Sequence, residues 1–320
     1  MSLEKISNKN IAVLGNQSIT KFLVDFLKEK KIKIKYLITL KNKSNYGVTD
    51  PFKFNEVEFK KIYVNSYSLT KKQDVDKLQK LKIDFLIVFG WSRLIPEWLI
   101  KNVKISVLGV HAGMYAPPRS RGRAVFNWSI IGNFKKMIFY CMELKPGIDD
   151  GNIFLKQKSN ITVHDDIETI YMKNSIISSE MFFKIIKNWN YYKKNKFPQR
   201  NSGATYLPKR TPEEGFINWN LPSNYIFNFI KALKKPYPGA FTFLKDSKII
   251  IEESIPFELN IKGKFSYGEI IYVFPNKNFV IKCKKGFLLI KKYRSEKKIK
   301  IEPKLKLKSS NIKEFNFKKI

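Results

Sequence analysis

Apolar residues come in short continuous runs along the first half of the chain, separated by amphipathic or charged stretches. The runs at 10–16 and 85–91 contain no charged residue, which is typical of strands that are buried on both faces of a parallel sheet. Further strand-like runs lie at 33–40, 60–67, 104–111 and 137–144, and helix-like stretches lie at 18–31, 70–82, 95–103 and 165–190. This alternation predicts a Rossmann-like α/β domain with a mostly parallel, doubly wound sheet.

The pattern changes after a polar linker at 190–210. Beyond it, one amphipathic helix at 224–235 precedes five short strand-like segments with turn signals between them, at 240–245, 248–254, 268–274, 279–284 and 286–294. Several short strands at this spacing are typical of a small barrel. We therefore expect two domains, an α/β domain over 1–203 and an OB-like β-barrel with a Lys-rich tail over 204–320.

The composition argues against disorder and against a membrane protein. Hydrophobic residues make up 43% of the 320 residues and aromatic residues 14%, which is ample for packed cores. No apolar run approaches the roughly 18 to 20 residues of a membrane-spanning helix, and the N-terminus lacks the zones of a signal peptide. Cys141 and Cys283 are the only cysteines, so neither a disulfide framework nor zinc-ligand spacing is expected. We expect a cytoplasmic protein without a metal or a membrane partner.

The formal net charge of +34 admits two interpretations. Of the 61 basic residues only seven are arginines, and the lysines are spread along the whole chain. Nucleic-acid binders more often cluster their charge and use arginine for phosphate contacts. A solvated, lysine-rich surface is one interpretation. The other is a field that attracts a polyanion such as a sugar nucleotide or a tRNA.

A histidine and an aspartate, which are both suited to acid–base chemistry, lie at or just after the ends of strand-like runs. His111, one of only two histidines, ends the run at 104–111, and Asp149 lies in PGIDDGN after the run at 137–144. In open α/β sheets ligands bind outside the carboxyl ends of the strands. A histidine and an aspartate at adjacent strand ends could meet there and share proton transfer.

Arginines concentrate just after the histidine. Arg119, Arg121 and Arg123 fall within five residues of one another. Planar guanidinium forks suit the phosphates of a nucleotide-linked acceptor. Alternatively, Arg121 and Arg123 brace the loop by bonding backbone carbonyls or carboxylates such as Asp149 and Asp150. Both interpretations stay open.

Four motifs together resemble a known family. GVHAGMYAPPRSRGRAVFNW at 109–128 and GIDDGNIF at 147–154 resemble the signature of folate-dependent formyltransferases, the family of methionyl-tRNA and sugar-nucleotide formyltransferases. YLPKRTPEEGFINWNL at 206–221 and IKALKKPYPGAF at 230–241 resemble the family's linker and the start of its C-terminal barrel. The resemblance runs from about residue 10 to about residue 295. Each motif alone is weak, but their combination in this order is specific.

The resemblance implies a co-substrate and roles for matching residues. His111 corresponds to the catalytic histidine, which stabilises negative charge on the formyl oxygen. Asp149 corresponds to the aspartate that orients this histidine and helps to remove a proton from the attacking amine. The co-substrate is 10-formyltetrahydrofolate, and the segment at 89–95 corresponds to the part that holds its pterin. The residues expected to bind it are Phe89, Gly90, Trp91, Leu94, Ile95 and Asp149.

An apolar slot with backbone hydrogen-bonding groups suits a flat heterocycle such as a pterin. Ordinary core packing of Trp91 and Leu94 is the alternative interpretation. Gly15 ends the first strand-like run, but GNQSIT lacks the further glycines of a dinucleotide fingerprint, so NAD binding is not expected.

Gly109 departs from the family pattern. The family usually has asparagine two residues before the histidine, as a further donor to the developing oxyanion. Losing one such donor typically costs roughly 10²–10³ in rate. A backbone N–H, a water, Arg121 or Asn127 are the candidates to replace it. The loop from His111 to Arg121 is also about two residues longer than in the commonest form, and both features resemble a branch from surface-polysaccharide pathways.

We expect formyl transfer to the primary amine of an amino sugar nucleotide, with Arg119, Arg121, Arg123 and Asn127 contacting the acceptor. Methionyl-tRNA is the alternative acceptor. Basic charge favours it, whereas Gly109 and a polar loop at 41–61 that carries lysines but no arginine argue against it. A non-catalytic binding protein on the same scaffold is a third hypothesis. A homodimer is compatible with all three.

Overall fold

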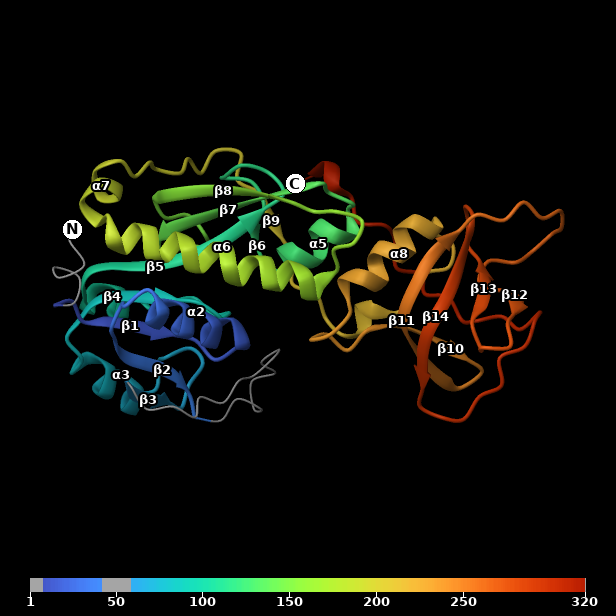
Figure 1. The fold of residues 1–320 in the computed structure, drawn as a ribbon, viewed down its shortest axis with the longest axis horizontal. Helices are drawn as coiled ribbons and strands as arrows, with labels where there is room; N and C mark the ends of the chain where they lie inside the picture. Colours follow the sequence, from blue (N-terminus) through green and yellow to red (C-terminus); the bar gives the residue numbers. More distant parts are fainter. Residues whose placement is uncertain (1–7, 42–58, 320) are drawn as a thin grey trace. The chain divides into compact units, whose positions relative to one another are not determined.

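The computed structural model describes residues 8–41 and 59–319, so most of the predicted loop at 41–61 lies outside the described residues. The chain divides into two compact units (Figure 1). The first unit consists of 1–122, 136–160 and 171–206, and the second consists of 123–135, 161–170 and 207–320. The position of a domain boundary within the linker stays a prediction.

A seven-stranded sheet forms the centre of the first unit, with strand order β3-β2-β1-β4-β5-β7-β8. The neighbours from β3 to β5 run parallel, whereas β7 and β8 are antiparallel to their neighbours. The predicted Rossmann-like, mostly parallel sheet is therefore confirmed. Its strands are β1 (Ile11–Leu14), β2 (Ile34–Leu40), β3 (Lys60–Val64), β4 (Ile83–Val88), β5 (Val103–Gly113), β7 (Lys136–Glu143) and β8 (Ile153–Asn160).

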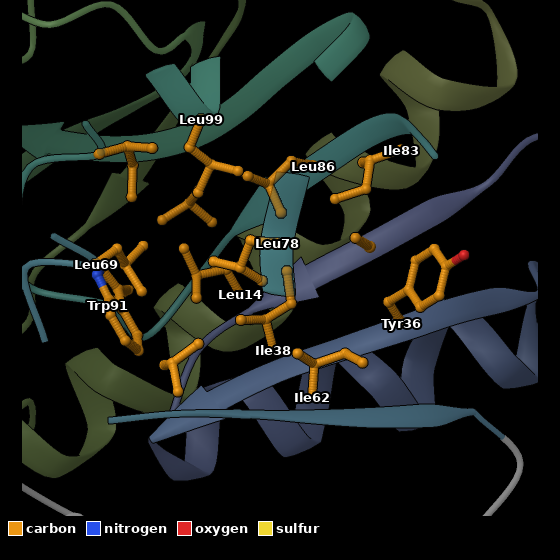
Figure 2. Packing of buried hydrophobic residues seen from close by; sticks show 14 of the residues in the cluster. Leu14, Tyr36, Ile38, Ile62, Leu69, Leu78, Ile83, Leu86, Trp91 and Leu99 are labelled. Atoms are coloured by element: carbon orange, nitrogen blue, oxygen red, sulfur yellow. The ribbon is translucent and has the colours of Figure 1, made fainter. Parts of the chain in front are cut away.

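Helices cover both faces of this sheet. On the face drawn in Figure 2, Leu86 of β4 packs in one cluster with Leu78 and Leu99 of the covering helices. On the opposite face, the ring of Phe89 meets that of Phe182 edge-on, with 5.6 Å between the centroids. Central strands buried on both faces explain the uninterrupted apolar runs of β1 and β4. The helices are α2 (Ser18–Glu29), α3 (Lys72–Gln79), α4 (Glu97–Asn102), α6 (Ile167–Lys187) and α7 (Trp189–Lys194).

The ends of β1 and β4 approach closely because residue 15 is a glycine. A Cβ there would collide with the Phe89 carbonyl oxygen and with Thr20. The Thr20 hydroxyl donates to the Phe89 carbonyl at 2.7 Å, and the Asn16 amide donates to the Gly90 carbonyl at 3.2 Å. These contacts fix the start of the segment at 89–95 where the strand order reverses, which is the usual place for a ligand in such sheets.

The second unit contains a five-stranded antiparallel sheet with strand order β10-β11-β14-β13-β12. Its strands are β10 (Ala240–Leu244), β11 (Ser247–Phe257), β12 (Ile270–Val273), β13 (Phe279–Lys282) and β14 (Phe287–Ser295), and its helices are α5 (Val125–Ile131) and α8 (Ser223–Ala232). The remaining short elements are β6 (Arg121–Gly122), β9 (Tyr206–Leu207), η2 (Glu213–Gly215) and η3 (Phe317–Lys319). Across the described ranges, no helix is long and apolar enough to cross a membrane.

Residues 304–308 of the Lys-rich tail connect the two edge strands of the antiparallel sheet. The Lys304 amide donates to the Ile270 carbonyl of β12, and the Lys308 amide donates to the Phe243 carbonyl of β10, both at 2.8 Å. Leu307 is buried between these contacts. The tail thus completes the OB-like arrangement that the five strands leave open.

Leu307→Ala should lower the free energy of unfolding of the second unit by about 2–5 kcal/mol, because it removes a buried side chain from this closure. Lys306→Ala is the matched control. Its side chain is exposed, so the change should stay within about 0.5 kcal/mol. Urea unfolding followed by tryptophan fluorescence measures both, and equal effects of the two substitutions would contradict a closing role for the tail.

Candidate active site

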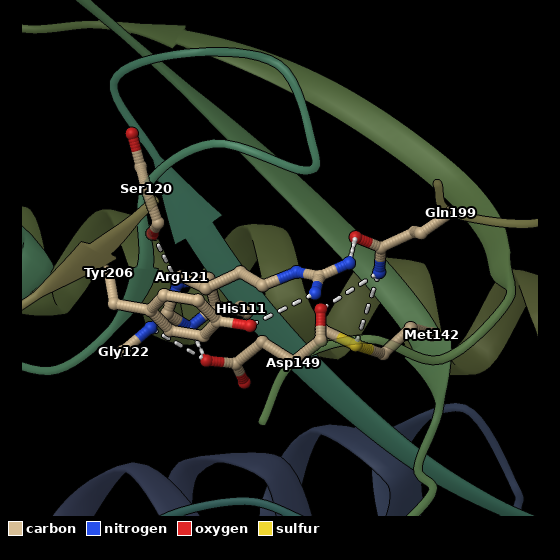
Figure 3. A network of polar contacts seen from close by, with 8 residues as sticks. All are labelled: His111, Ser120, Arg121, Gly122, Met142, Asp149, Gln199 and Tyr206. Carbon is tan, nitrogen blue, oxygen red and sulfur yellow. Dashed lines mark hydrogen bonds and ion pairs between the residues drawn. The ribbon is translucent and has the colours of Figure 1, made fainter. Parts of the chain in front are cut away.

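His111 lies near the end of β5, and Asp149 lies in the turn between β7 and β8 (Figure 3). The Oδ2 atom of Asp149 is 3.5 Å from Nδ1 of His111. The other ring nitrogen, Nε2, is 2.9 Å from the Ser120 carbonyl oxygen. The His111 side chain is 11% exposed and that of Asp149 is 22% exposed, so the pair is partly open to solvent. The two residues expected at strand ends are therefore brought together.

The turn that carries Asp149 has an unusual backbone. Asp149 has a φ of +51°, in the left-handed region that costs a non-glycine residue about 1–3 kcal/mol. Gly151 has no room for a side chain, because a Cβ would collide with the Glu143 carbonyl oxygen. The Gly122 amide donates to Oδ2 of Asp149 at 3.0 Å. The carboxylate is thus held between an imidazole and a backbone N–H.

The pairing of His111 with the Asp149 carboxylate is suited to proton transfer. Both ring nitrogens of His111 face oxygen atoms, so the ring is oriented from two sides. An imidazole paired with a carboxylate can donate a hydrogen bond to a developing oxyanion and can take a proton from an incoming nucleophile.

Tyr140 lies directly across the sheet from His111, in register with it on β7. The two rings are 5.5 Å apart between centroids. Tyr140 is fully buried, and its hydroxyl has no hydrogen-bond partner among the described residues. Burial, and then the charge of Asp149, raise the pKa of Tyr140 well above its usual value, while Arg121 acts in the opposite direction. The phenol therefore stays neutral, and it lies near enough to both side chains to be influenced by their charges.

An apolar side chain lies beside Gly109, where the resemblance leads one to expect asparagine. A Cβ at this position would be 2.7 Å from Cδ2 of Leu144. Arg121 and Asn127, two expected substitutes for the missing donor, donate to other protein groups. Asn127 belongs to the second unit, where its amide donates to the Ala232 carbonyl at 2.8 Å.

The segment at 89–95 is anchored by its own buried side chains. Trp91 packs edge-on against Tyr67, with 4.6 Å between the ring centroids. The Tyr67 hydroxyl is 2.6 Å from the hydroxyl of Ser92 and accepts from the Ser92 amide at 3.0 Å. Leu94 is 57% exposed, whereas Phe89, Trp91 and Ile95 are buried in the core. A direct ligand contact of these three side chains stays a prediction, and their burial favours a supporting role.

The predicted acceptor-binding residues are divided between the two units and differ in exposure. Arg119 is exposed and stacks on Tyr115, with Cζ 4.0 Å from the ring centroid. Arg123 is also exposed but belongs to the second unit. Arg121 and Asn127 are each only 1% exposed. Contact of these four residues with an acceptor stays a prediction, and the burial of the last two argues against it for them.

Arg121 bonds to uncharged groups of the linker. Its Nη2 donates to Oε1 of Gln199 at 3.0 Å, and its Nη1 donates to Oδ1 of Asn201 at 3.0 Å and to the Tyr206 hydroxyl at 3.4 Å. These side-chain partners differ from the carboxylates and backbone carbonyls expected for a loop-bracing arginine. Sequence reasoning assigned Gln199 no function, because a polar linker gives no periodic signal that singles out one amide.

The described part of the chain contains no group of three or more histidine, cysteine or acidic side chains arranged to hold a metal ion. The polar groups that the structure brings together at this position are the imidazole, the carboxylate and the Gly122 amide.

Two family models match the chain. The formyl transferase model covers residues 9–186, and the formyl transferase C-terminal domain model covers residues 209–311. The bifunctional polymyxin resistance protein ArnA of Wigglesworthia glossinidia brevipalpis is 31% identical over 216 residues, which are 68% of this chain and 32% of ArnA. The methionyl-tRNA formyltransferase of Caldanaerobacter subterraneus subsp. tengcongensis is 31% identical over 176 residues, 55% of this chain and 56% of that protein. The matched regions span about a third and just over half the length of these two relatives.

A similar fold has been solved for the N-formyltransferase from Helicobacter canadensis in complex with folinic acid and dTDP-3-aminofucose. The TM-score is 0.62, with 20% sequence identity, over 89% of this chain and 100% of that chain. At this identity the likeness concerns the fold alone.

Tyr140→Phe should leave the free energy of unfolding unchanged or raise it by up to about 1 kcal/mol, because the buried hydroxyl has no hydrogen bond to lose. Tyr67→Phe is the matched control. It removes a buried hydroxyl that bonds to Ser92 and should cost about 1–2 kcal/mol. Chemical denaturation measures both values, and a loss for Tyr140→Phe as large as that of the control would mean that its hydroxyl has a partner.

Proposed function

The chain belongs to the formyl transferase family, and we propose that it transfers the formyl group of 10-formyltetrahydrofolate to the primary amine of an amino sugar carried on a nucleotide. Members of this family are enzymes that transfer formyl groups. The proposal depends on one observation above all, the contact of His111 with Asp149 at the carboxyl ends of the strands, where ligands bind in α/β sheets.

The segment at 89–95 has the features that a folate needs. A pterin ring requires apolar surface together with main-chain hydrogen-bonding groups. Leu94 offers exposed apolar surface, and Gly90, which has a φ of +77°, is half-buried. The buried aromatic and aliphatic neighbours hold this backbone in place. We assign folate contact to Gly90, Leu94 and Asp149, and support of the slot to Phe89, Trp91 and Ile95.

The two central residues divide the work of the reaction. When bound, 10-formyltetrahydrofolate supplies the formyl group. Asp149 orients His111 and takes the proton that the amine loses as its nitrogen bonds to the formyl carbon. His111 keeps Nδ1 toward Asp149, and its Nε2 exchanges the Ser120 carbonyl for the formyl oxygen, to which it donates a hydrogen bond while that atom gains negative charge. The pair then returns the proton to the folate nitrogen that leaves the formyl carbon, so no proton is gained or lost.

Two observations support a nucleotide-linked acceptor. Arg119 and Arg123 are exposed and carry guanidinium groups that suit phosphates. The Helicobacter canadensis enzyme, which has this fold, was solved with an amino sugar joined to dTDP. Methionyl-tRNA is the alternative acceptor. It is favoured by the net charge of +34 and by the matched methionyl-tRNA formyltransferases. The apolar neighbour of Gly109 favours the third candidate, a binding protein without turnover.

Incubation with 10-formyltetrahydrofolate and separate acceptors distinguishes these functions. The acceptors are a panel of nucleotide-linked amino sugars and charged initiator tRNA, and formylated product is detected by mass spectrometry. We expect product with at least one amino sugar nucleotide. Product with the tRNA alone would make the chain a methionyl-tRNA formyltransferase. Folate binding without product from any acceptor would favour a non-catalytic protein.

His111→Asn and Asp149→Asn should each lower kcat by at least about 10²-fold, because each removes a group that handles charge or a proton in the reaction. The control is His164→Asn, which changes the other histidine, an exposed residue of the second unit, and should leave kcat unchanged. Circular dichroism checks that all three variants are folded. Near-normal turnover of either site variant would remove that residue from the mechanism.

A further inference from the structure

A continuous chain of hydrogen bonds runs from Arg121 to the backbone of the Asp149 turn (Figure 3). Arg121 donates to Oε1 of Gln199 at 3.0 Å. Nε2 of Gln199 then donates to the carbonyl oxygens of Asp149 and Gly151, at 2.9 and 2.8 Å. One side chain of the linker therefore bonds to the backbone on both sides of Asp150.

Arg121 determines which way the Gln199 amide points. A guanidinium can only donate hydrogen bonds, so the group facing it must be the amide oxygen. This leaves the NH₂ group with two N–H donors directed at the turn, and the two carbonyl oxygens use both. Nε2 also lies 3.9 Å from the sulfur of Met142. In the opposite orientation, the NH₂ group of Gln199 would face the guanidinium, which is also a donor, and the amide oxygen would face the two carbonyl oxygens of the turn. Neither contact could form a hydrogen bond.

The turn needs such support because the backbone of Asp149 is strained. Asp149 is a non-glycine residue at a φ of +51°, and such a conformation persists only where its surroundings enforce it. Relaxation of the backbone at Asp149 would swing its side chain away from His111. It would also break the bond from the Gly122 amide to Oδ2. The geometry of the proposed catalytic pair therefore depends on the bonds to the two carbonyl oxygens.

The burial of Arg121 lowers the stability of the fold, so a purely structural role does not explain it. Its side chain is 1% exposed, and in the described ranges its hydrogen-bond partners are two amides and a phenol, all uncharged. A buried charge without an anion destabilises a fold. A positive charge here also lies near enough to act electrostatically on Tyr140, as Asp149 does.

We propose that Gln199, oriented by Arg121, is a positioning residue that keeps the Asp149 carboxylate beside His111 for proton transfer. This inference rests on the proposed transfer reaction. It assigns the buried arginine a role inside the site rather than a contact with the acceptor. It also makes part of the linker a component of the active site.

Gln199→Glu tests the positioning role, because the variant keeps its size and its bond to Arg121 but loses both N–H donors to the turn. Asn201→Asp is the matched control. It adds the same charge next to the same guanidinium, yet the hydrogen bond of the Asn201 side chain in the described structure goes to Arg121 and not to the turn at 149–151. Both variants pair the buried charge with a carboxylate. The urea unfolding midpoint of Asn201→Asp should therefore stay at or above that of the unmodified protein, whereas that of Gln199→Glu should be lower, because its second oxygen faces the two carbonyl oxygens of the turn.

Two measurements are made on the whole protein. The first is kcat and KM for formylation of the acceptor identified in the panel. We expect kcat of Gln199→Glu to fall about tenfold or more with little change in KM, because a small misplacement of a reacting group lowers the rate strongly. For Asn201→Asp, kcat should stay within about twofold.

The second measurement does not need turnover. Hydrogen exchange of the Gly122 amide, followed by NMR, reports whether the Asp149 carboxylate still accepts its bond. We expect faster exchange at Gly122 in Gln199→Glu and not in Asn201→Asp. Unchanged exchange and kcat in Gln199→Glu would overturn the inference, and so would equal effects of the two variants. If the unmodified protein formylates no acceptor, the proposed function fails, while the exchange data still decide whether Gln199 holds the turn.

Discussion

The site depends above all on how the chain reverses between β7 and β8. The pairing of β7 with β5 ends with Glu143 opposite Leu108, whereas His111 is paired with Tyr140 inside β7, so the strand pairing alone does not aim the Asp149 carboxylate at the imidazole. That direction comes from a left-handed residue, from a glycine at position 151 that avoids a collision with the backbone of Glu143, and from the amide of Gln199. A strained turn can be maintained when several weak bonds act on it at once.

The parts of the fold that sequence predicts well are those where one physical signal dominates. Uninterrupted apolar runs at β1 and β4 indicate strands that are buried on both faces. His111 and Asp149 could be paired because His111 ends the strand-like run at 104–111 and Asp149 follows the strand-like run at 137–144. The signal is weaker for β8, which was not predicted. Its burial alternates after two apolar residues, and five of its eight residues are exposed or half-exposed polar side chains, so its sequence resembles a surface loop.

Sequence reasoning fails where the outcome depends on three-dimensional packing. Trp91 and Leu94 are both apolar, yet the first is buried and the second is exposed, because Tyr67 and Ser92 fix the loop between them. Arginine is usually a surface residue. The burial of Arg121 becomes visible only in the fold, where the linker at 199–206 supplies the hydrogen-bond acceptors around it. In the same way, the tail that closes the barrel of the second unit does so through backbone bonds, to which its lysine-rich composition gives no clue.

Gly109 and Gln199 together suggest how this chain builds its polar site. Next to Gly109 the surface is apolar, since Leu144 fills the space where a side-chain donor would project. An amide at that position could only be accommodated if the leucine moved. The groups that remain to handle charge are the imidazole and the carboxylate. The backbone of Ser120 and Gly122 orients them, and the buried arginine with its glutamine supports the turn that carries the carboxylate. With fewer donors aimed at the reacting atoms, accurate placement of those that remain has a larger effect on the rate. This is a physical reason for keeping a costly buried charge beneath the turn.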